Sequence, residues 1–266
     1  MDGRGIVIAV YEEKDPQFEY ANEVKNFLCE RGYNSEIINF GKNFREALFC
    51  VVLGGDGTML RVAHYAAVCD VPMIGINLGN LGFLTDVDKK HGLGALEKIL
   101  SGKYTSEKRM MLEAEFGASE IISLQERLAL NEICIGVNGK LIDYSIYINE
   151  QPMATMRTDG IIISTPTGST AYNLSAGGPI LVPGGQMIAI TPICPHSLSA
   201  RPWVIGACDT VRVVAKQDSQ VSVDGDLRGK IPPGESVLIK NSPHVATILR
   251  TTQVNFYSTL RKKKLL

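Results

Sequence analysis

The sequence predicts two parts, an N-terminal α/β domain with an open, doubly wound, Rossmann-like parallel sheet and a following β-sandwich-like domain. Up to about residue 104, apolar strand-like segments alternate with segments whose apolar residues recur at helical spacing. From there to about residue 250, helical spacing largely disappears, and strand-like segments are separated by turn residues. We therefore expect domains at 1–104 and 105–250, and a tail at 251–266 that returns to the first domain.

The first domain is expected to begin with the apolar strand Ile6–Val10. A helix should follow at 18–31, because Phe18, Ala21, Val24 and Leu28 fall on one helical face, and Gly32 suits its C-terminal cap. Further strands are expected at 35–40, 48–53 and 72–76, and further helices at 58–67 and 93–100.

The second domain should consist almost entirely of strands. Strands are expected at 111–116, 145–148, 161–164, 187–190, 210–214, 220–223 and 236–239, and turns at 138–139, 183–185, 224–226 and 232–234. The exception is 170–176, which follows a loop and is expected to form a short helix.

Composition excludes several classes of protein. The 266 residues carry a formal net charge of −1, so no overall field favours nucleic acid. No apolar run approaches the roughly 18 residues that a membrane span needs. The six cysteines form no Cys-x-x-Cys pair and are expected to be reduced core residues of a cytoplasmic protein. The four histidines are scattered, so no metal site built by the protein is expected.

The segment from 51 to 60 carries the most chemistry. Three apolar residues run into Gly54-Gly55-Asp56-Gly57-Thr58, and a helix is expected to start there. Glycines let a ligand approach the main chain, and a helix start presents unpaired N–H groups to an anion. A carboxylate would repel phosphate, so Asp56 makes sense if it accepts the proton of a hydroxyl near that phosphate. A plain strand-to-helix turn is the alternative.

Two further segments are candidates for binding. The segment from Ser164 to Ser175 is rich in Ser and Thr, whose hydroxyls suit hydrogen bonds to ribose, phosphate or a base edge. An ordinary polar loop is the alternative. Asn131-Glu132 is a polar pair after the apolar run 128–130, and alone it would indicate only an exposed strand end.

Together these segments resemble the NAD kinase family over essentially the whole chain. The similarity rests on five segments in order: Gly54 to Thr58, Asn80 to Phe83, Asn131-Glu132, Asp159-Gly160 with Ser164 to Pro179, and Thr191 to Leu198. A Gly-Gly-Asp-Gly turn alone also occurs in diacylglycerol kinases and phosphofructokinases, whereas all five segments in this order are highly specific.

The resemblance implies ATP-dependent phosphorylation of the 2′-hydroxyl of the adenosine ribose of NAD, giving NADP. It makes Asp56 the proton acceptor and implies Mg²⁺, or another divalent cation, arriving with ATP. It also implies nucleotide contacts from other residues, with some of these contacts shared between subunits of a homodimer or homotetramer. These are Gly54, Gly55, Gly57, Thr58, Arg61, Phe83, Asn131, Glu132, Arg157, Asp159, Thr170, Ala171, Tyr172, Asn173, Leu174, Ser175, Cys194 and Asp226, the last standing where the family often has glutamine.

Two other functions share parts of this pattern. A lipid or sugar kinase would use the same catalytic turn, but the 170–175 loop and Asn131-Glu132 argue against it. A non-enzymatic dinucleotide sensor would keep the fold, but it would not need the carboxylate of Asp56. The sequence leaves open whether polyphosphate replaces ATP, whether NADH replaces NAD, whether NADPH inhibits, and how many subunits assemble.

Overall fold

The computed structural model describes residues 5–11, 13, 15–38, 47–79, 82–117, 122–136, 141–253 and 255–265. The predicted turn at 138–139, the end of the predicted strand at 39–40, and Asn80 and Leu81 lie outside these ranges. The chain divides into two compact units, one formed by Met1–Lys108 with Val245–Leu266 and the other by Arg109–His244. The first is α/β and the second almost all β, so the predicted fold class is confirmed.

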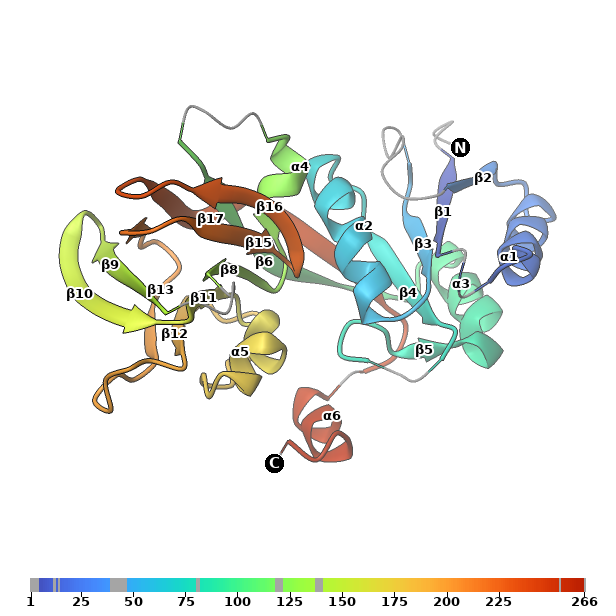
Figure 1. Cartoon of the computed structure of the whole chain (residues 1–266). Helices are drawn as coiled ribbons and strands as arrows, with labels where there is room; N and C mark the ends of the chain where they lie inside the picture. The colour runs from blue at the N-terminus through green and yellow to red at the C-terminus, as the bar shows by residue number, and fades with distance from the viewer. Residues whose placement is uncertain are drawn as a thin grey trace. The chain divides into compact units, whose positions relative to one another are not determined.

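The first unit is built on a parallel sheet (Figure 1). Its strands run in the order β2-β1-β3-β4. Their bounds are β1 Ile6–Val10, β2 Ser35–Ile38, β3 Cys50–Leu53 and β4 Met73–Asn77, and the two-residue strand β5, Val87–Asp88, pairs with β4. The continuous burial of β1, β3 and β4 is typical of parallel strands covered on both faces.

Helices cover both faces of this sheet. Buried side chains of α1 (Glu19–Cys29) and α3 (Gly92–Leu100) form one cluster with Ile74 and Ile76 of β4. Gly75 points to the other face, where a Cβ would lie 2.9 Å from Met59 Sδ of α2 (Asp56–Val68). The unit is therefore doubly wound, as Figure 1 shows for α1, α2 and α3.

The C-terminal part of the chain belongs to this first unit. The long strand β17, Ser236–Arg250, has its end paired in parallel with β4, where Ile248 lies opposite Met73. The helix α6, Phe256–Lys262, follows after a short segment. The predicted return of the C-terminal segment to the first part is confirmed.

The second unit contains two sheets with one shared core. One sheet is antiparallel throughout, in the order β13-β12-β11-β8-β15-β16, and the other contributes β10-β9-β14 and the start of β17. Their bounds are β8 Glu132–Gly136, β9 Ile142–Ile148, β10 Gln151–Thr158, β11 Gly160–Ser164, β12 Met187–Ile193, β13 Trp203–Gly206, β14 Val211–Ala215, β15 Ser219–Val223 and β16 Asp226–Ile231. The strand β6, Thr105–Glu115, also pairs with β17 and with the two-residue strand β7, Leu128–Ala129.

A sandwich-like core lies between these sheets. Alternate residues of β14 and β15 are buried, and both strands contribute to one apolar cluster with Tyr144, Ile163 and Val237. Each fully buried Val, Ile or Leu contributes about 1.5–3 kcal/mol by leaving water. Besides strands, the unit has short helical segments at α4 (Leu124–Arg127), η2 (Gly168–Thr170) and α5 (Tyr172–Ser175). Of these, α5 lies within 170–176, where a short helix is expected, and η2 overlaps that range only at Thr170.

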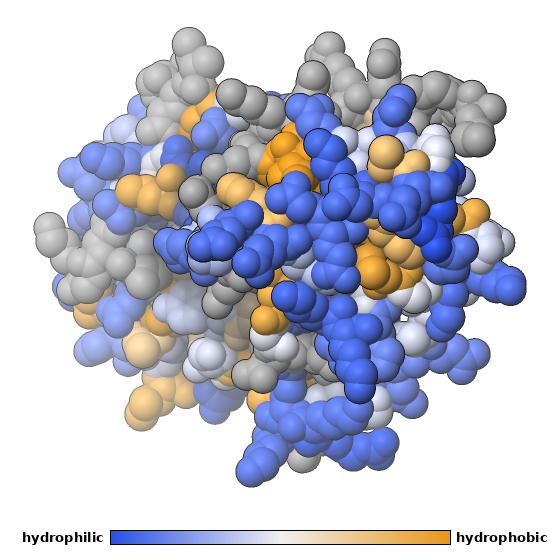
Figure 2. Space-filling view, turned by 90° about the vertical axis from the view of Figure 1, so that its right-hand side faces the viewer, coloured by the Kyte–Doolittle hydropathy of each residue, from blue (hydrophilic) through white to orange (hydrophobic). Residues whose placement is uncertain are grey.

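The structure also shows the polarity of one face of the surface and the burial of the six cysteines. Viewed from the side of α1 and β2, the surface is mostly hydrophilic, with apolar residues in small groups (Figure 2). None of the helices in the described ranges combines the length and apolarity that crossing a bilayer requires. All six cysteines are free, but only Cys50 and Cys134 are buried. The predicted core position is wrong for Cys29, Cys194 and Cys208, which are exposed because they lie at a helix end or in turns.

Candidate active site

The glycine turn after β3 leads directly into α2, and Asp56 is the first residue of that helix. A Cβ on Gly54 would lie 2.2 Å from Thr58 Oγ1, so no larger residue fits there. The carbonyl of Gly55, the N-terminal cap, accepts a hydrogen bond from the Thr58 amide at 3.0 Å. The turn therefore places Asp56 at the carboxyl end of a parallel strand, where ligands of open α/β sheets bind.

The carboxylate of Asp56 is anchored by the loop that follows β4. Its Oδ1 accepts hydrogen bonds from the amides of Leu84 (3.1 Å) and Thr85 (3.2 Å) and from the Thr85 hydroxyl (3.1 Å). Its Oδ2 accepts one bond, from the Phe83 amide at 2.7 Å. A carboxylate offers about two lone-pair sites per oxygen, so Oδ2 keeps room for another donor. The loop orients the carboxylate and leaves Oδ2 as its accepting atom.

Gly82 lets this loop approach so closely. A Cβ on Gly82 would lie 1.9 Å from Asp56 Oδ1 and 2.2 Å from Oδ2, far inside contact distance. The Gly82 amide also closes the loop by donating to the Thr85 carbonyl at 3.2 Å. In the sequence Gly82 is visible only as part of the 80–83 family segment, and the structure gives it a defined role.

Arg250, the last residue of β17, binds the same loop through its guanidinium group. It is 4% exposed, and its Nη1 donates to the Leu84 carbonyl at 3.0 Å and to Asp86 Oδ1 at 2.8 Å. Its Nε donates to Glu107 Oε2 at 3.1 Å. No local pattern in the sequence marks Arg250 as a site residue, because these partners lie more than a hundred residues away along the chain.

The other predicted residues of this unit lie around the same turn. Gly57 is exposed, and Arg61 is exposed on α2 with its guanidinium 5.5 Å from the centre of the Tyr11 ring. Phe83 contributes its amide to Asp56, and its ring lies 6.2 Å from that of Phe256. The structure therefore brings the predicted residues from 54 to 61 and Phe83 together at one end of the parallel sheet.

In the second unit, Asp224 holds the main chain of the Asn131-Glu132 segment. Its Oδ2 accepts from the Leu130 amide at 2.8 Å, and its Oδ1 accepts from Asn131 at 2.8 Å and Glu132 at 3.0 Å. Asp224 and Gly225 have φ of 48° and 88°, the two positive values of a type I′ hairpin turn. The sequence predicts Asp224 only as a turn residue, and its visible signal is the Asp-Gly pair between two strands.

The carboxyl group of Glu132 is buried. The residue is 7% exposed, and within the part of the chain that the structure describes its Oε2 has no hydrogen-bond partner. Burial, and then the charge of nearby Asp224, raise the pKa of Glu132 to about 8. At neutral pH the group is therefore mostly protonated and can donate a hydrogen bond to a ligand.

Glu132→Gln is expected to change the pH dependence of stability. An unfolded glutamate has a pKa of about 4.3, so between that pH and about 8 the folded protein holds the extra proton. Stability therefore falls as pH rises through this range, and the full cost is present above pH 8. Glutamine removes this slope, so the variant should gain several kcal/mol relative to the wild type between pH 5 and pH 9.

Chemical denaturation at pH 5, 7 and 9 measures this effect. Glu36→Gln, at an exposed glutamate of β2, is the control and should follow the wild type at every pH. Parallel pH curves for Glu132→Gln and the wild type would contradict the buried, protonated state.

The Ser/Thr-rich segment is held by its own buried side chains. Thr165 Oγ1 donates to the Leu130 carbonyl at 2.6 Å, and Ser169 Oγ donates to the Pro166 carbonyl at 2.7 Å. The fully buried Asn173 donates from Nδ2 to the Ser169 carbonyl at 3.1 Å. The predicted binding residues that reach the surface are the half-buried or exposed ones: Thr170, Ala171, Tyr172, Leu174 and Ser175.

Two further predicted segments of the second unit meet beside β11. The Asp159 amide donates to the Ile193 carbonyl at 3.0 Å, and the His196 amide donates to the Arg157 carbonyl at 2.9 Å. The exposed Cys194 lies between these contacts in a left-handed conformation, with φ of 46°. The structure thus brings Arg157 and Asp159 together with the 193–196 segment.

Two further expectations concern the role of Asp226 and the binding of a metal ion. Asp226 begins β16, and its Oδ2 accepts from Arg228 Nη2 at 2.9 Å. In the described ranges, no three side chains of His, Cys, Asp or Glu gather as ligands of a metal ion.

Comparisons with known proteins agree with this arrangement. A family model described as "ATP-NAD kinase N-terminal domain" matches residues 38–104, and one described as "ATP-NAD kinase C-terminal domain" matches residues 130–251. An NAD kinase of Caldanaerobacter subterraneus subsp. tengcongensis is 38% identical over 94% of this chain and 95% of its own. An NAD kinase of Salmonella choleraesuis is 39% identical over 89% and 88%.

Solved structures show the same fold. An NAD kinase from Archaeoglobus fulgidus, crystallised in complex with ATP, superposes with a TM-score of 0.82 at 25% identity, over 96% of this chain and 98% of that one. Two matching family models and relatives of this similarity leave one conclusion: this chain belongs to the NAD kinase family.

Proposed function

We propose that this protein transfers the terminal phosphoryl group of ATP to the 2′-hydroxyl of the adenosine ribose of NAD, giving NADP and ADP. Membership of the family supports the reaction. The observation that carries its chemistry is the carboxylate of Asp56, with Oδ1 held by three hydrogen bonds and Oδ2 by one. A fixed carboxylate with one oxygen available suits the acceptance of a proton from a sugar hydroxyl.

In the proposed step, Asp56 Oδ2 accepts the 2′-hydroxyl proton while the 2′-oxygen forms a bond to the γ-phosphorus. The bond from that phosphorus to the oxygen bridging to the β-phosphate breaks, and ADP leaves with the electron pair. Phosphoryl transfer passes through a loose transition state, so most of the rate gain comes from positioning and charge stabilisation. The amides of residues 83–85 contribute by fixing the base before the substrates arrive.

The contacts to NAD, the acceptor of the phosphoryl group, are proposed to come from the second unit. Asn131 and Glu132 are proposed to hold adenine and ribose, and the surface of the segment from Thr170 to Ser175 to contact the adenosine. A protonated Glu132 can donate to a ring nitrogen or a ribose oxygen, which an ionised carboxylate cannot do. Arg157 and Asp159 are proposed to contact the nicotinamide side.

Mg²⁺ is proposed to arrive with ATP and to offset the charge of its phosphates. Such ions are commonly held by substrate phosphates, water and one or two carboxylates, so a cage built by the protein is not required.

We also propose a homodimer or homotetramer. Leu198 and Val204 are exposed apolar side chains in or near β13, and such residues are commonly buried between subunits. Leu198 lies two residues after His196, whose amide donates to the carbonyl of Arg157, a proposed nicotinamide contact. Light scattering after size exclusion should give two or four times the 29.0 kDa of the chain.

Gly82→Ala is expected to reduce turnover by about tenfold or more, because the methyl group of the alanine would displace the Asp56 carboxylate. Gly94→Ala is the matched control: it lies in α3, where a Cβ meets nothing within 4 Å, and alanine suits a helix. Steady-state kinetics and thermal unfolding of both variants provide the check. Normal turnover in a folded Gly82→Ala protein would contradict the role of the close approach.

The proposed function is tested by a coupled assay with purified protein, ATP, Mg²⁺ and NAD, in which an NADP-specific dehydrogenase reports NADP. ATP-dependent formation of NADP is expected. Labelled ATP with a panel of lipid and sugar acceptors tests the other kinase activity. Tight binding of NAD without product over hours would overturn the proposal in favour of a sensor.

A further inference from the structure

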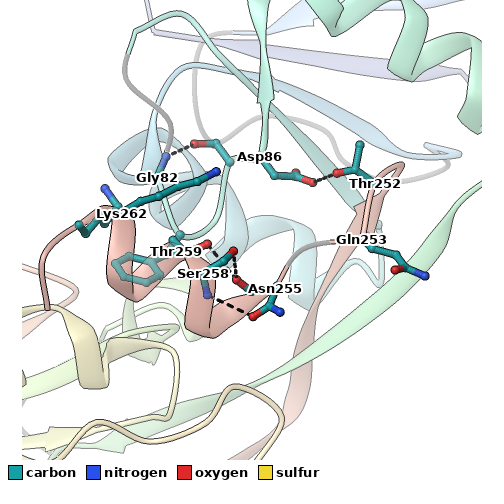
Figure 3. Close-up of a pocket in the computed structure, with 11 residues that line it drawn as sticks. Gly82, Asp86, Thr252, Gln253, Asn255, Ser258, Thr259 and Lys262 are labelled. Carbon is teal, nitrogen blue, oxygen red and sulfur yellow. Dashed lines mark hydrogen bonds between the residues drawn. The ribbon is translucent and has the colours of Figure 1, made fainter. Parts of the chain in front are cut away.

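A pocket of about 220 Å³ lies in the first unit between the 82–86 loop and the C-terminal segment (Figure 3). Gly82 and Asp86 line it from the loop, and Ser258, Thr259 and Lys262 line it from α6. Pockets that hold drug-sized ligands usually measure about 300–1,000 Å³, so this one suits a smaller group such as a phosphate chain. Of its lining residues, Phe83 alone is among the nucleotide contacts expected from the sequence, and no ligand has so far been given to the pocket as a whole.

The charge of the lining favours an anion. Lys262 and Lys263 both line the pocket, and no ion pair between described residues involves either ammonium group. The Lys263 ammonium lies 5.4 Å from the centre of the Phe83 ring, which orients it by a cation–π contact. Asp86 is the acidic side chain of the lining, and the buried Arg250 compensates its charge at 2.8 Å.

Some hydrogen-bond donors of the pocket already have an acceptor within the protein, and others do not. The Ser258 hydroxyl donates to the Asn255 carbonyl at 2.7 Å, and the Thr252 hydroxyl donates to Asp86 Oδ2 at 2.9 Å. These two hydroxyl protons are therefore already donated within the protein and are not available to a ligand. The side-chain amide nitrogens of Gln253 and Asn255 have no acceptor among the described residues, so they can serve a ligand together with the two lysines.

The position of the pocket connects it with the proposed chemistry. Phe83 and Thr85, which line the pocket, are two of the three residues whose amides bind the Asp56 carboxylate. A ligand in the pocket would therefore rest on the loop that fixes the base. Both substrates of the proposed reaction carry phosphates, and the triphosphate of the donor has more negative charge than the diphosphate of NAD.

We infer that this pocket binds the phosphate chain of the phosphoryl donor, with Lys262 and Lys263 as its charge partners. This inference rests on the proposed function for the identity of the donor. The binding of a phosphate chain itself does not depend on turnover, so it can be measured separately.

The test compares two double variants that remove equal charge. Lys262→Gln with Lys263→Gln removes the pocket lysines, and Arg261→Gln with Lys264→Gln removes exposed cations that are not part of the lining. Calorimetry at 0.15 M salt, about the physiological ionic strength, measures binding of inorganic tripolyphosphate and of ATP.

The pocket double variant should weaken both ligands by about tenfold or more, because charge-assisted hydrogen bonds are lost. The control double variant should stay within about twofold. In the coupled assay, KM for ATP should rise and KM for NAD should stay unchanged. Equal effects of the two double variants, or no binding of tripolyphosphate to the wild type, would overturn the inference. Binding as expected in a protein that makes no NADP would instead overturn the proposed function alone.

Discussion

Asp56→Asn is expected to lower turnover by about 10²-fold or more, the scale usual for the loss of a general base. An amide cannot accept the 2′-hydroxyl proton. Its carbonyl oxygen can keep the three hydrogen bonds now made to Oδ1, but its NH₂ group would then face the Phe83 amide. The mismatch of two donors should cost about 1–3 kcal/mol of stability and leave the fold intact.

The decisive comparison is between turnover and ligand binding. Affinity for NAD should stay near the wild-type value in Asp56→Asn, because the proposed acceptor contacts belong to other residues. Calorimetry with NAD and single-turnover formation of NADP measure the two quantities. Formation of NADP at a nearly normal rate would show that another group takes the proton.

Asp224→Ala has the second largest expected effect. It removes the acceptor of three main-chain amides at Leu130, Asn131 and Glu132, each of which costs about 1–3 kcal/mol if it stays buried and unpaired. The Asn131-Glu132 segment should lose its fixed position, so KM for NAD should rise about tenfold or more while kcat changes less. The loss of the Asp224 charge should also lower the pKa of Glu132.

Asp209→Ala is the matched control for this variant. Asp209 also holds a turn of the second unit, where its Oδ2 accepts from the Gly206 amide at 3.0 Å. Its loss should reduce stability and leave KM for NAD unchanged. If Asp209→Ala and Asp224→Ala raised KM equally, the effect would reflect general loosening of the unit rather than the position of Asn131.

The parts of the fold that the sequence predicts well are those with a local signal. The strands before and after the glycine turn are continuous apolar runs, and α1 shows helical spacing with a glycine after it. The sequence does not predict the strand β10, because Gln151–Thr158 has mostly exposed or half-buried side chains and little apolar alternation. Its place comes from pairing with β9, which no single segment reveals.

Some residues of the candidate site also have a local signal in the sequence. The position of Asp56 follows from its local glycines, the Ser/Thr-rich segment is visible in its hydroxyl content, and Asn131-Glu132 follows from the family resemblance. The roles of Gly82, Asp224 and Arg250 come from partners 26 to 166 positions away, so local pattern could not show them. Nor could it show the burial of the Glu132 carboxyl, which is set by the packing around β8.

The central claim is that Asp56 Oδ2 meets the oxygen that becomes phosphorylated. A crystal structure of the protein with NAD and a non-hydrolysable ATP analogue measures that distance directly. We expect Oδ2 within about 3.2 Å of the ribose 2′-oxygen, with Oδ1 still bound by the amides of Leu84 and Thr85. A complex with NAD in place and the carboxylate out of hydrogen-bonding reach of that oxygen would contradict the account.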